Sequence, residues 1–180
     1  MGLKILAAVA LAASLGTAAN AATSLIDFND LTAPGFSGNF SVLSTGSPGI
    51  AAAPNDTPFL VAPSVGGGSS GTATYTTSNS ITAFSFDWGT PDTYNTLTFR
   101  SGATVVASFT GTGLSAGNYG YTFTTAQDVN NVDFSSTQRA FEIDNVSVTA
   151  VPEPTTWALL IVGFGMVGVA ARRRAGVVAA

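Results

Sequence analysis

Apolar and polar residues alternate through most of the middle of the chain. The alternation recurs in six stretches, whose apolar members are Phe84, Phe86 and Trp88; Leu97 and Phe99; Val105, Ala107 and Phe109; Tyr119, Tyr121 and Phe123; Val132 and Phe134; and Phe141 and Ile143. A period of two places such side chains on one face of a strand. Turn residues separate the stretches, a spacing typical of all-β domains. The pattern predicts an antiparallel β-sandwich or jelly roll, with a hairpin turn at Ser101-Gly102.

The segment 34–71 does not follow this alternation. It is rich in glycine and proline, which favour turns and interrupt regular elements. We interpret it as long loops around two short edge strands, at residues 40–43 and Phe59–Ala62.

The apolar parity changes near the end of the alternating region. Phe141 and Ile143 are odd-numbered, whereas the next apolar residues, Val146 and Val148, are even-numbered. A strand of period two cannot change face without an irregularity. We therefore predict a β-bulge near Asp144-Asn145.

The first 21 residues form a different pattern. Lys4 precedes an apolar run at 5–15. For cleavage after Ala21, the small residues Ala19 and Ala21 occupy the −3 and −1 positions. This order is typical of a secretory signal peptide at 1–21. It predicts export through the Sec translocon and cleavage by signal peptidase. The alternative is an N-terminal membrane anchor.

A second apolar run lies near the C-terminus. The 17 residues at 155–171 carry no charge, Trp157 lies near their start, and Arg172, Arg173 and Arg174 follow them. A membrane-spanning helix needs about 17–25 such residues, and flanking arginines favour the cytoplasmic side. We predict a transmembrane helix at about 155–171, with Pro152 outside. The alternative, a buried core helix with a basic tail, would normally show a polar face.

The residues around this run also carry a resemblance. They are Pro152, Glu153, Pro154, Thr155, Thr156, Trp157 and Ala158, followed after the apolar run by Arg172, Arg173 and Arg174. This order closely resembles the PEP-CTERM sorting signal, in its PEPxxWA form, of exported Gram-negative proteins. The resemblance implies processing near Pro-Glu-Pro by an exosortase, a membrane enzyme, in cells that make extracellular polysaccharide. It implies a protein held transiently in the inner membrane and then located at the outer surface or outside the cell.

These segments divide the chain into a signal peptide at 1–21, an ectodomain at 22–150 and a sorting signal at 151–180. The ectodomain contains two arginines and nine carboxylates, a net charge of −7, and no lysine, histidine or cysteine. This balance disfavours nucleic-acid binding, and the lack of cysteine excludes disulfides and thiol catalysis. We expect no enzymatic activity. The remaining catalytic alternative is a glycosidase with paired carboxylates, drawn from Asp87, Asp92 or Glu142, although no spacing indicates a pair.

One stretch of the ectodomain is suited to a sugar ligand. Trp88, Asp92, Tyr94 and Asn95 combine two aromatic rings with side chains that form hydrogen bonds. The alternative is that Trp88 continues the core face of Phe84 and Phe86, and that Asp92 stabilises a turn.

Two acidic segments lie near the two ends of the ectodomain. Asp27 and Asp30 lie in the first segment and Asp144 in the second. The pattern is similar to carbohydrate-binding-module jelly rolls, whose first and last strands pair and often share a structural calcium. That resemblance implies a calcium site formed by Asp144 with Asp27 or Asp30. The alternative is a bulge at Asp144 and a solvated turn after Asp27.

Two functions remain open from the sequence. The first is a surface or matrix protein, processed at Pro-Glu-Pro and associated with exopolysaccharide or biofilm. The second is a carbohydrate-binding module with a specific glycan ligand.

Overall fold

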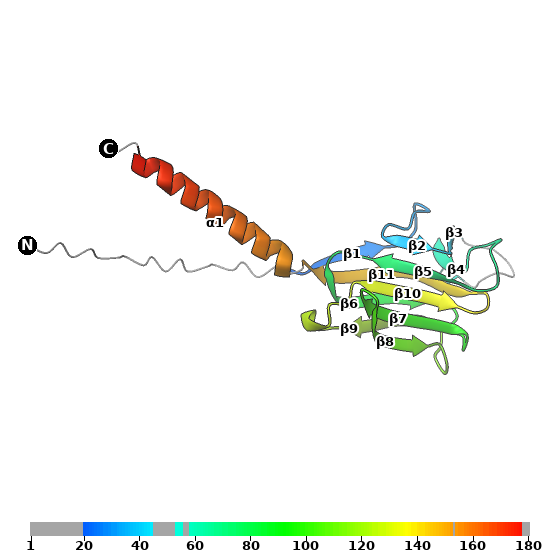
Figure 1. Cartoon of the computed structure of the whole chain (residues 1–180). Helices are drawn as coiled ribbons and strands as arrows, with labels where there is room; N and C mark the ends of the chain where they lie inside the picture. Colours follow the sequence, from blue (N-terminus) through cyan, green and yellow to red (C-terminus); the bar gives the residue numbers. More distant parts are fainter. Residues whose placement is uncertain (1–19, 45–52, 56–57, 153, 178–180) are drawn as a thin grey trace, which may run out of the picture.

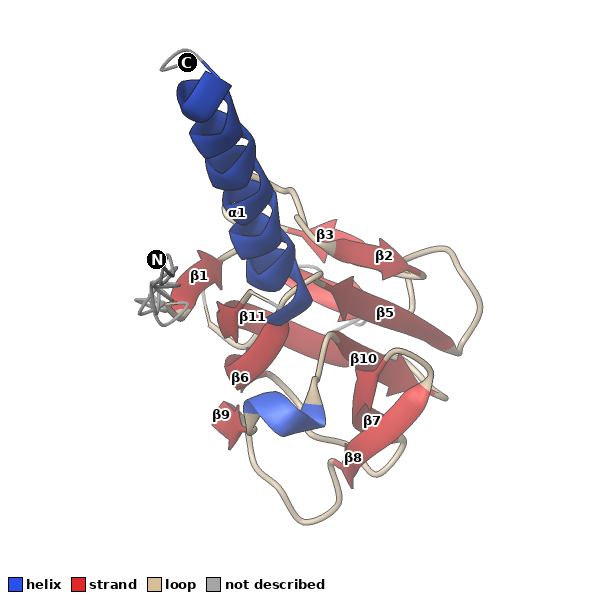
Figure 2. Cartoon of the chain, turned by 60° about the vertical axis from the view of Figure 1, so that its left-hand side comes forward, coloured by secondary structure: helices blue, strands red, loops and turns tan. Residues whose placement is uncertain are grey.

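The computed structural model describes residues 20–44, 53–55, 58–152 and 154–177. Most of the predicted signal peptide, and Glu153 of the predicted sorting signal, lie outside the described residues. The described chain forms two antiparallel sheets that pack face to face as a β-sandwich, with a single turn of 3₁₀-helix, η1 (Thr125–Gln127), between two of the strands (Figures 1 and 2). This architecture confirms the mostly β, two-sheet prediction.

The first sheet is built around β11 (Phe141–Val151), the longest strand. Its order is β3 (Ser41–Leu43), β4 (Phe59–Ala62), β11, β6 (Ser80–Trp88) and β9 (Gly117–Thr122), and β1 (Ala22–Ile26) also pairs with β11. β4 pairs with the first residues of β11, and β1 pairs with its later residues, from Val146 to Ala150. The first and last strands of the sandwich are therefore neighbours.

The second sheet contains the remaining five strands. Their order is β2 (Phe36–Gly38), β5 (Gly71–Thr76), β10 (Asn131–Ser136), β7 (Asn95–Ser101) and β8 (Thr104–Thr110). β7 and β8 form the predicted hairpin, whose turn lies at Gly102-Ala103, one residue later than predicted. Gly102 has a φ of +55°, a conformation that glycine adopts at little cost.

Aromatic side chains from both sheets form the core. The fully buried aromatic residues are Trp88, Phe28, Phe59, Phe84, Phe86, Phe99, Phe134 and Phe141. The Phe86 and Phe134 rings, one from each sheet, meet edge to face with centroids 5.3 Å apart. Burial of each such ring contributes about 1.5–3 kcal/mol to folding, which is the main stabilising term in a domain without disulfides.

The structure confirms the predicted bulge in β11. The register with β6 shifts between Asp144 and Ser147, and Asn145 has a φ of +49°. The bulge allows Ile143 and Val146 both to face the core, where both are fully buried. The change of apolar parity in the sequence is thus accommodated by residues inserted in one strand.

Two predictions about strands are wrong in detail. Phe59–Ala62 is not an edge strand, because β4 lies between β3 and β11 and all four of its residues are buried. Val105 does not face the core, because the β7–β8 register shifts at Phe99 and Arg100. Val106 has no partner at that shift and contacts the core instead, so that the side chain of Val105 is 57% exposed.

The helix α1 (Pro154–Val177) follows β11 and extends away from the sandwich (Figures 1 and 2). Large apolar side chains are exposed along it, namely Leu160, Ile161, Val162, Phe164, Met166, Val167 and Val169. Among the described residues, no helix combines the length and the apolar character that crossing a membrane requires.

Candidate functional site

The segment that resembles a sorting signal begins where the sandwich ends. β11 ends at Val151, Pro152 belongs to no element, and α1 begins at Pro154. Proline has a fixed φ and no backbone N–H, so Pro152 cannot donate a hydrogen bond to a neighbouring strand. Pro152 therefore favours the end of strand pairing at this position. The sorting segment departs from the sandwich directly after Val151.

The first strand of the sandwich, β1, begins beside this exit. Ala22, which follows the predicted signal-peptide cleavage point, pairs with Ala150, and the Thr23 and Thr149 hydroxyl groups are 2.8 Å apart. The two predicted processing positions therefore lie at the same end of two paired strands, β1 and β11. Loss of the chain beyond Val151 would leave all five β1–β11 residue pairs in place.

Trp88, predicted as a core or a ligand residue, lies at the opposite end of β6 and is fully buried. Its ring stacks on Phe141, with centroids 4.4 Å apart and an angle of 3° between the planes. One ring face is therefore covered and no part is open to solvent. The burial favours the core interpretation.

Asn95 and Asp92 form the turn after Trp88. Asn95 is fully buried, and its amide donates to the carbonyl oxygens of Thr90 and Ala140 at 3.0 and 3.1 Å. Its side-chain oxygen accepts from the hydroxyl of Ser136 at 2.7 Å. The Asp92 carbonyl oxygen accepts from the Asn95 N–H at 3.0 Å. Asn95 therefore links two loops within the protein, a structural role.

Tyr94 lies beside the same loops and is half-buried. Its hydroxyl donates to the carbonyl oxygen of Arg139 at 3.1 Å. Burial, reinforced by a hydrogen bond and charge interaction with Asp92 and by the charge of Glu142, raises the pKa of Tyr94 to about 12. Tyr94 is a neutral hydrogen-bond donor at neutral pH.

The Tyr94→Phe variant tests this contact. At neutral pH we expect a loss of about 0.5–1.5 kcal/mol of unfolding free energy, the usual net value of one hydrogen bond. Because the raised pKa favours the neutral phenol in the folded state, Tyr94 stabilises the protein below about pH 10, and that stability is lost as the pH rises toward 12. Urea unfolding should therefore show a smaller difference in unfolding free energy between the wild type and Tyr94→Phe at pH 11 than at pH 7. An equal difference at both pH values would contradict the raised pKa of Tyr94.

Asp30 and Asp144, two of the three acidic residues predicted to bind calcium, accept hydrogen bonds within the protein. The backbone N–H and hydroxyl of Thr32 donate to Asp30 at 2.9 and 2.6 Å, and these bonds lower the pKa of Asp30. Asp144 is fully buried in the bulge, where its carboxylate accepts from the Asn145 N–H at 2.7 Å. Asp27 follows the Ile26–Val146 pair and therefore lies next to that bulge.

The structure thus brings Asp27 toward the Asp144 bulge, while Asp30 is used in a local turn. Among the described residues, no three acidic, histidine or cysteine side chains are grouped as metal ligands would be. Calcium also accepts carbonyl oxygens and water, so that the calcium site remains a prediction from the resemblance.

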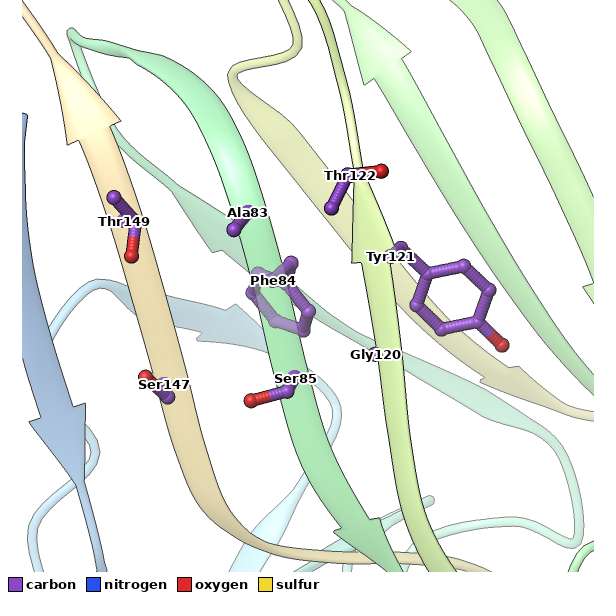
Figure 3. A pocket seen from close by; sticks show the side chains of 8 residues that line it. All are labelled: Ala83, Phe84, Ser85, Gly120, Tyr121, Thr122, Ser147 and Thr149. Atoms are coloured by element: carbon purple, nitrogen blue, oxygen red, sulfur yellow. The ribbon is translucent and has the colours of Figure 1, made fainter.

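A shallow groove of about 340 Å³ lies on the first sheet, over β11, β6 and β9 (Figure 3). Its lining residues are Ala83, Phe84, Ser85, Gly120, Tyr121, Thr122, Ser147 and Thr149. Small side chains on β6 and the missing side chain of Gly120 leave the space open between the hydroxyl-bearing residues of the neighbouring strands. The groove presents hydroxyl groups and short apolar surfaces, without a charged lining residue.

Asp87 lies two residues beyond Ser85 on β6. Its two carboxylate oxygens accept from the side-chain amides of Asn118 and Asn145, each at 2.8 Å. These bonds join β9, β6 and β11 and hold the carboxylate in a fixed position. The sequence contains no signal for the groove, because its serine and threonine residues are of the kind that usually face solvent in a sheet.

Residues 150–174 match the family model described as the PEP-CTERM protein-sorting motif. No curated protein matches the chain.

Solved structures show similarity in fold. The K2 cleaved adhesin domain of Lys-gingipain aligns with a TM-score of 0.51 and 11% identity, covering 71% of this chain and 99% of that domain. A family 35 carbohydrate-binding module from Clostridium thermocellum aligns with a TM-score of 0.42 and 12% identity, covering 71% of this chain and 97% of that module. At such identities the first likeness concerns the fold alone.

The motif match and the residues Pro152, Pro154 and Trp157 agree with the resemblance predicted from the sequence. Such a motif implies export and processing by an exosortase-type membrane enzyme. The chain therefore carries the PEP-CTERM sorting motif, attached directly to the last strand of a β-sandwich.

Proposed function

We propose that this protein is a non-catalytic surface or matrix protein of a polysaccharide-producing cell. Its signal peptide at 1–21 directs it through the Sec translocon, and the sorting signal at 151–180 holds it in the inner membrane until an exosortase cuts near Pro-Glu-Pro. The sandwich, of the jelly-roll kind, is then released or attached outward and resides in the exopolysaccharide or biofilm.

The observation that carries this proposal is the match of residues 150–174 to the sorting motif, directly after β11. The uncharged run at 155–171 and the three arginines after it support membrane insertion with the arginines inside. The exposed apolar side chains of α1 support the same role, since large exposed apolar patches usually contact another protein or a membrane.

Expression of the full chain with and without its exosortase tests the proposal. With the enzyme, we expect a product shortened near Pro152 and recovered outside the inner membrane. Without it, we expect a longer product in the inner-membrane fraction. Identical C-termini and identical locations in both strains would contradict the proposal.

A second candidate function is binding of an uncharged glycan chain in the groove over β11, β6 and β9. The hydroxyls of Ser85, Ser147 and Thr149 offer donors and acceptors without charge, as neutral sugar hydroxyls require. The groove runs on a sheet face, which suits an extended chain more than a compact ligand. This candidate places a neutral polysaccharide on the sheet rather than at Trp88.

The Gly120→Leu variant tests this groove. A Cβ at Gly120 would have Ser85 Cβ as its nearest neighbour, at 3.9 Å, so that the fold tolerates a side chain that fills the groove. Titration with the purified exopolysaccharide of the producing cells should show saturable binding to the wild type and at least a tenfold weaker affinity for the variant. The matched control is Ser37→Leu, on the exposed face of the other sheet. Unchanged binding by Gly120→Leu would contradict this function.

A further inference from the structure

One side of the sandwich is built from a stretch of the chain that has no charged residue. The stretch is 101–127, and it contains no aspartate, glutamate, lysine or arginine, although the ectodomain carries a net charge of −7. It forms β8, the loop after β8, β9 and η1. β8 ends the second sheet and β9 ends the first, on the same side of the sandwich (Figures 1 and 2). This side therefore presents an uncharged surface on an acidic domain.

Aromatic side chains from the two end strands meet on this side. The ring centroids of Phe109 on β8 and Tyr121 on β9 are 4.8 Å apart. The ring of Phe99, on β7, lies 4.9 Å from Tyr121 and 4.7 Å from Phe123. Phe109 pairs with the fully buried Leu97, so that its ring lies on the inner face of β8. Phe109 is nevertheless 40% exposed, and Tyr121 and Phe123 are half-buried. The cluster thus closes the core and also presents ring surface to solvent.

These rings adjoin the groove on the first sheet. Tyr121 and Thr122 of β9 line that groove. The Tyr121 ring extends past β9, away from β6 and β11 (Figure 3). Burial raises the pKa of Tyr121, so that its hydroxyl is a neutral hydrogen-bond donor at neutral pH. A chain that crosses β9 from the groove would therefore meet the Tyr121 and Phe109 rings next.

We infer that Phe109 and Tyr121 form a second sugar subsite, beside the groove, for a neutral polysaccharide. The inference rests on the neutral-glycan candidate proposed above and extends it along the chain of the ligand. The groove holds one part of the polysaccharide, and the two rings hold a following sugar unit. The rings offer apolar area to the C–H face of that sugar, and the Tyr121 hydroxyl offers a hydrogen bond.

Charge and size favour a neutral polysaccharide over other occupants of this side. Acidic polymers are disfavoured because the net charge of −7 on the ectodomain repels them. A stable protein interface covers about 800 Å² on each partner, whereas this cluster exposes only parts of three rings. A sugar unit is small enough to pack on such a surface, and it requires no charged partner.

Titration calorimetry of the full chain in detergent micelles tests this inference. The probe is the neutral fraction of the purified exopolysaccharide of the producing cells. Phe109→Leu keeps an apolar side chain but lacks the ring, and we expect its affinity to be about fivefold weaker than that of the wild type, the usual value of one aromatic contact. Phe109→Tyr keeps the ring and should bind as the wild type does.

The matched control is Val105→Ala, on the same strand. Val105 pairs with Arg100 on the outer face of the second sheet and is 57% exposed, so that it lies on the opposite face of β8 from Phe109. We expect this variant to bind the polysaccharide with wild-type affinity. Circular dichroism and urea unfolding of each variant verify that the sandwich is retained.

The length of the ligand separates a sugar contact from a general loss of stability. Fragments of the polysaccharide, prepared by partial acid hydrolysis and sorted by length, serve as probes. The wild type and Phe109→Leu should bind the shortest fragments equally and differ only for longer ones. An equal loss at every length would overturn the inference and indicate a structural role for Phe109.

The remaining outcomes distinguish this subsite from the groove. No saturable binding by the wild type would overturn both the groove function and the subsite. Weakened binding by Gly120→Leu, together with wild-type affinity of Phe109→Leu for the whole polysaccharide, would overturn the subsite alone.

Discussion

Trp88→Ala is expected to lower the unfolding free energy by about 3–5 kcal/mol, the usual cost of truncating a large buried aromatic residue. The ring is fully buried, stacks on Phe141, and has neighbours in Phe86 and Tyr119. Domains of this kind have a total unfolding free energy of about 5–15 kcal/mol, so that the substitution removes a large part of it. Urea unfolding followed by circular dichroism measures the unfolding free energy of both proteins.

The control for this prediction is Trp88→Phe. A smaller ring keeps the stacking position on Phe141, and we expect it to cost less than the alanine variant. If Trp88→Ala retained wild-type stability but lost binding to a glycan, the core assignment would be wrong and a ligand role for Trp88 would be favoured.

Substitution of the Pro-Glu-Pro motif is expected to abolish processing. In Pro152→Ala/Glu153→Gln the chain loses the conformational restriction imposed by Pro152 and the single carboxylate between the sandwich and the apolar run. We expect the processed form to fall to below about a tenth of the wild-type amount, with the full-length form accumulating in the inner membrane. Pulse-labelling and cell fractionation measure both forms.

The matched control is Thr155→Ala/Thr156→Ala. The PEPxxWA pattern leaves these two positions variable, and they lie at the start of the apolar run, two and three residues after Glu153. We expect this variant to be processed as the wild type is. If both double variants were processed normally, recognition of the Pro-Glu-Pro motif would be excluded.

Much of the fold was predictable from the alternation of side chains. Phe84, Phe86 and Trp88 were predicted on one face of a strand, and all three are buried in β6. The bulge at Asp144-Asn145 was predictable because a parity change in a strand buried on one face requires an inserted residue. Which face of a strand is buried depends on the order of residues within that strand, so that a local pattern is enough to predict it.

Features that depend on which strands are neighbours were not predictable in this way. The exposure of Val105 results from a register shift against β7, which the alternation within β8 does not contain. The burial of β4 results from its position between β3 and β11. The groove likewise requires Ser85, Gly120 and Ser147 to be on adjacent strands, although they are far apart in the sequence.

The candidate ligand residues illustrate the same limit. Trp88, Tyr94 and Asn95 are close in sequence and contain groups that bind sugars, and the structure places them near one another. Their contacts are made within the protein, with Phe141, Arg139 and Ala140. The partners come from one distant loop and strand, whose proximity the sequence does not reveal.

Intact-mass spectrometry of the protein from each cell fraction tests the account most directly. We predict an extracellular or outer-surface species that starts at Ala22 and ends near Pro152, without the apolar helix or the three arginines. A full-length chain with both termini intact, recovered from the cytosol, would contradict it.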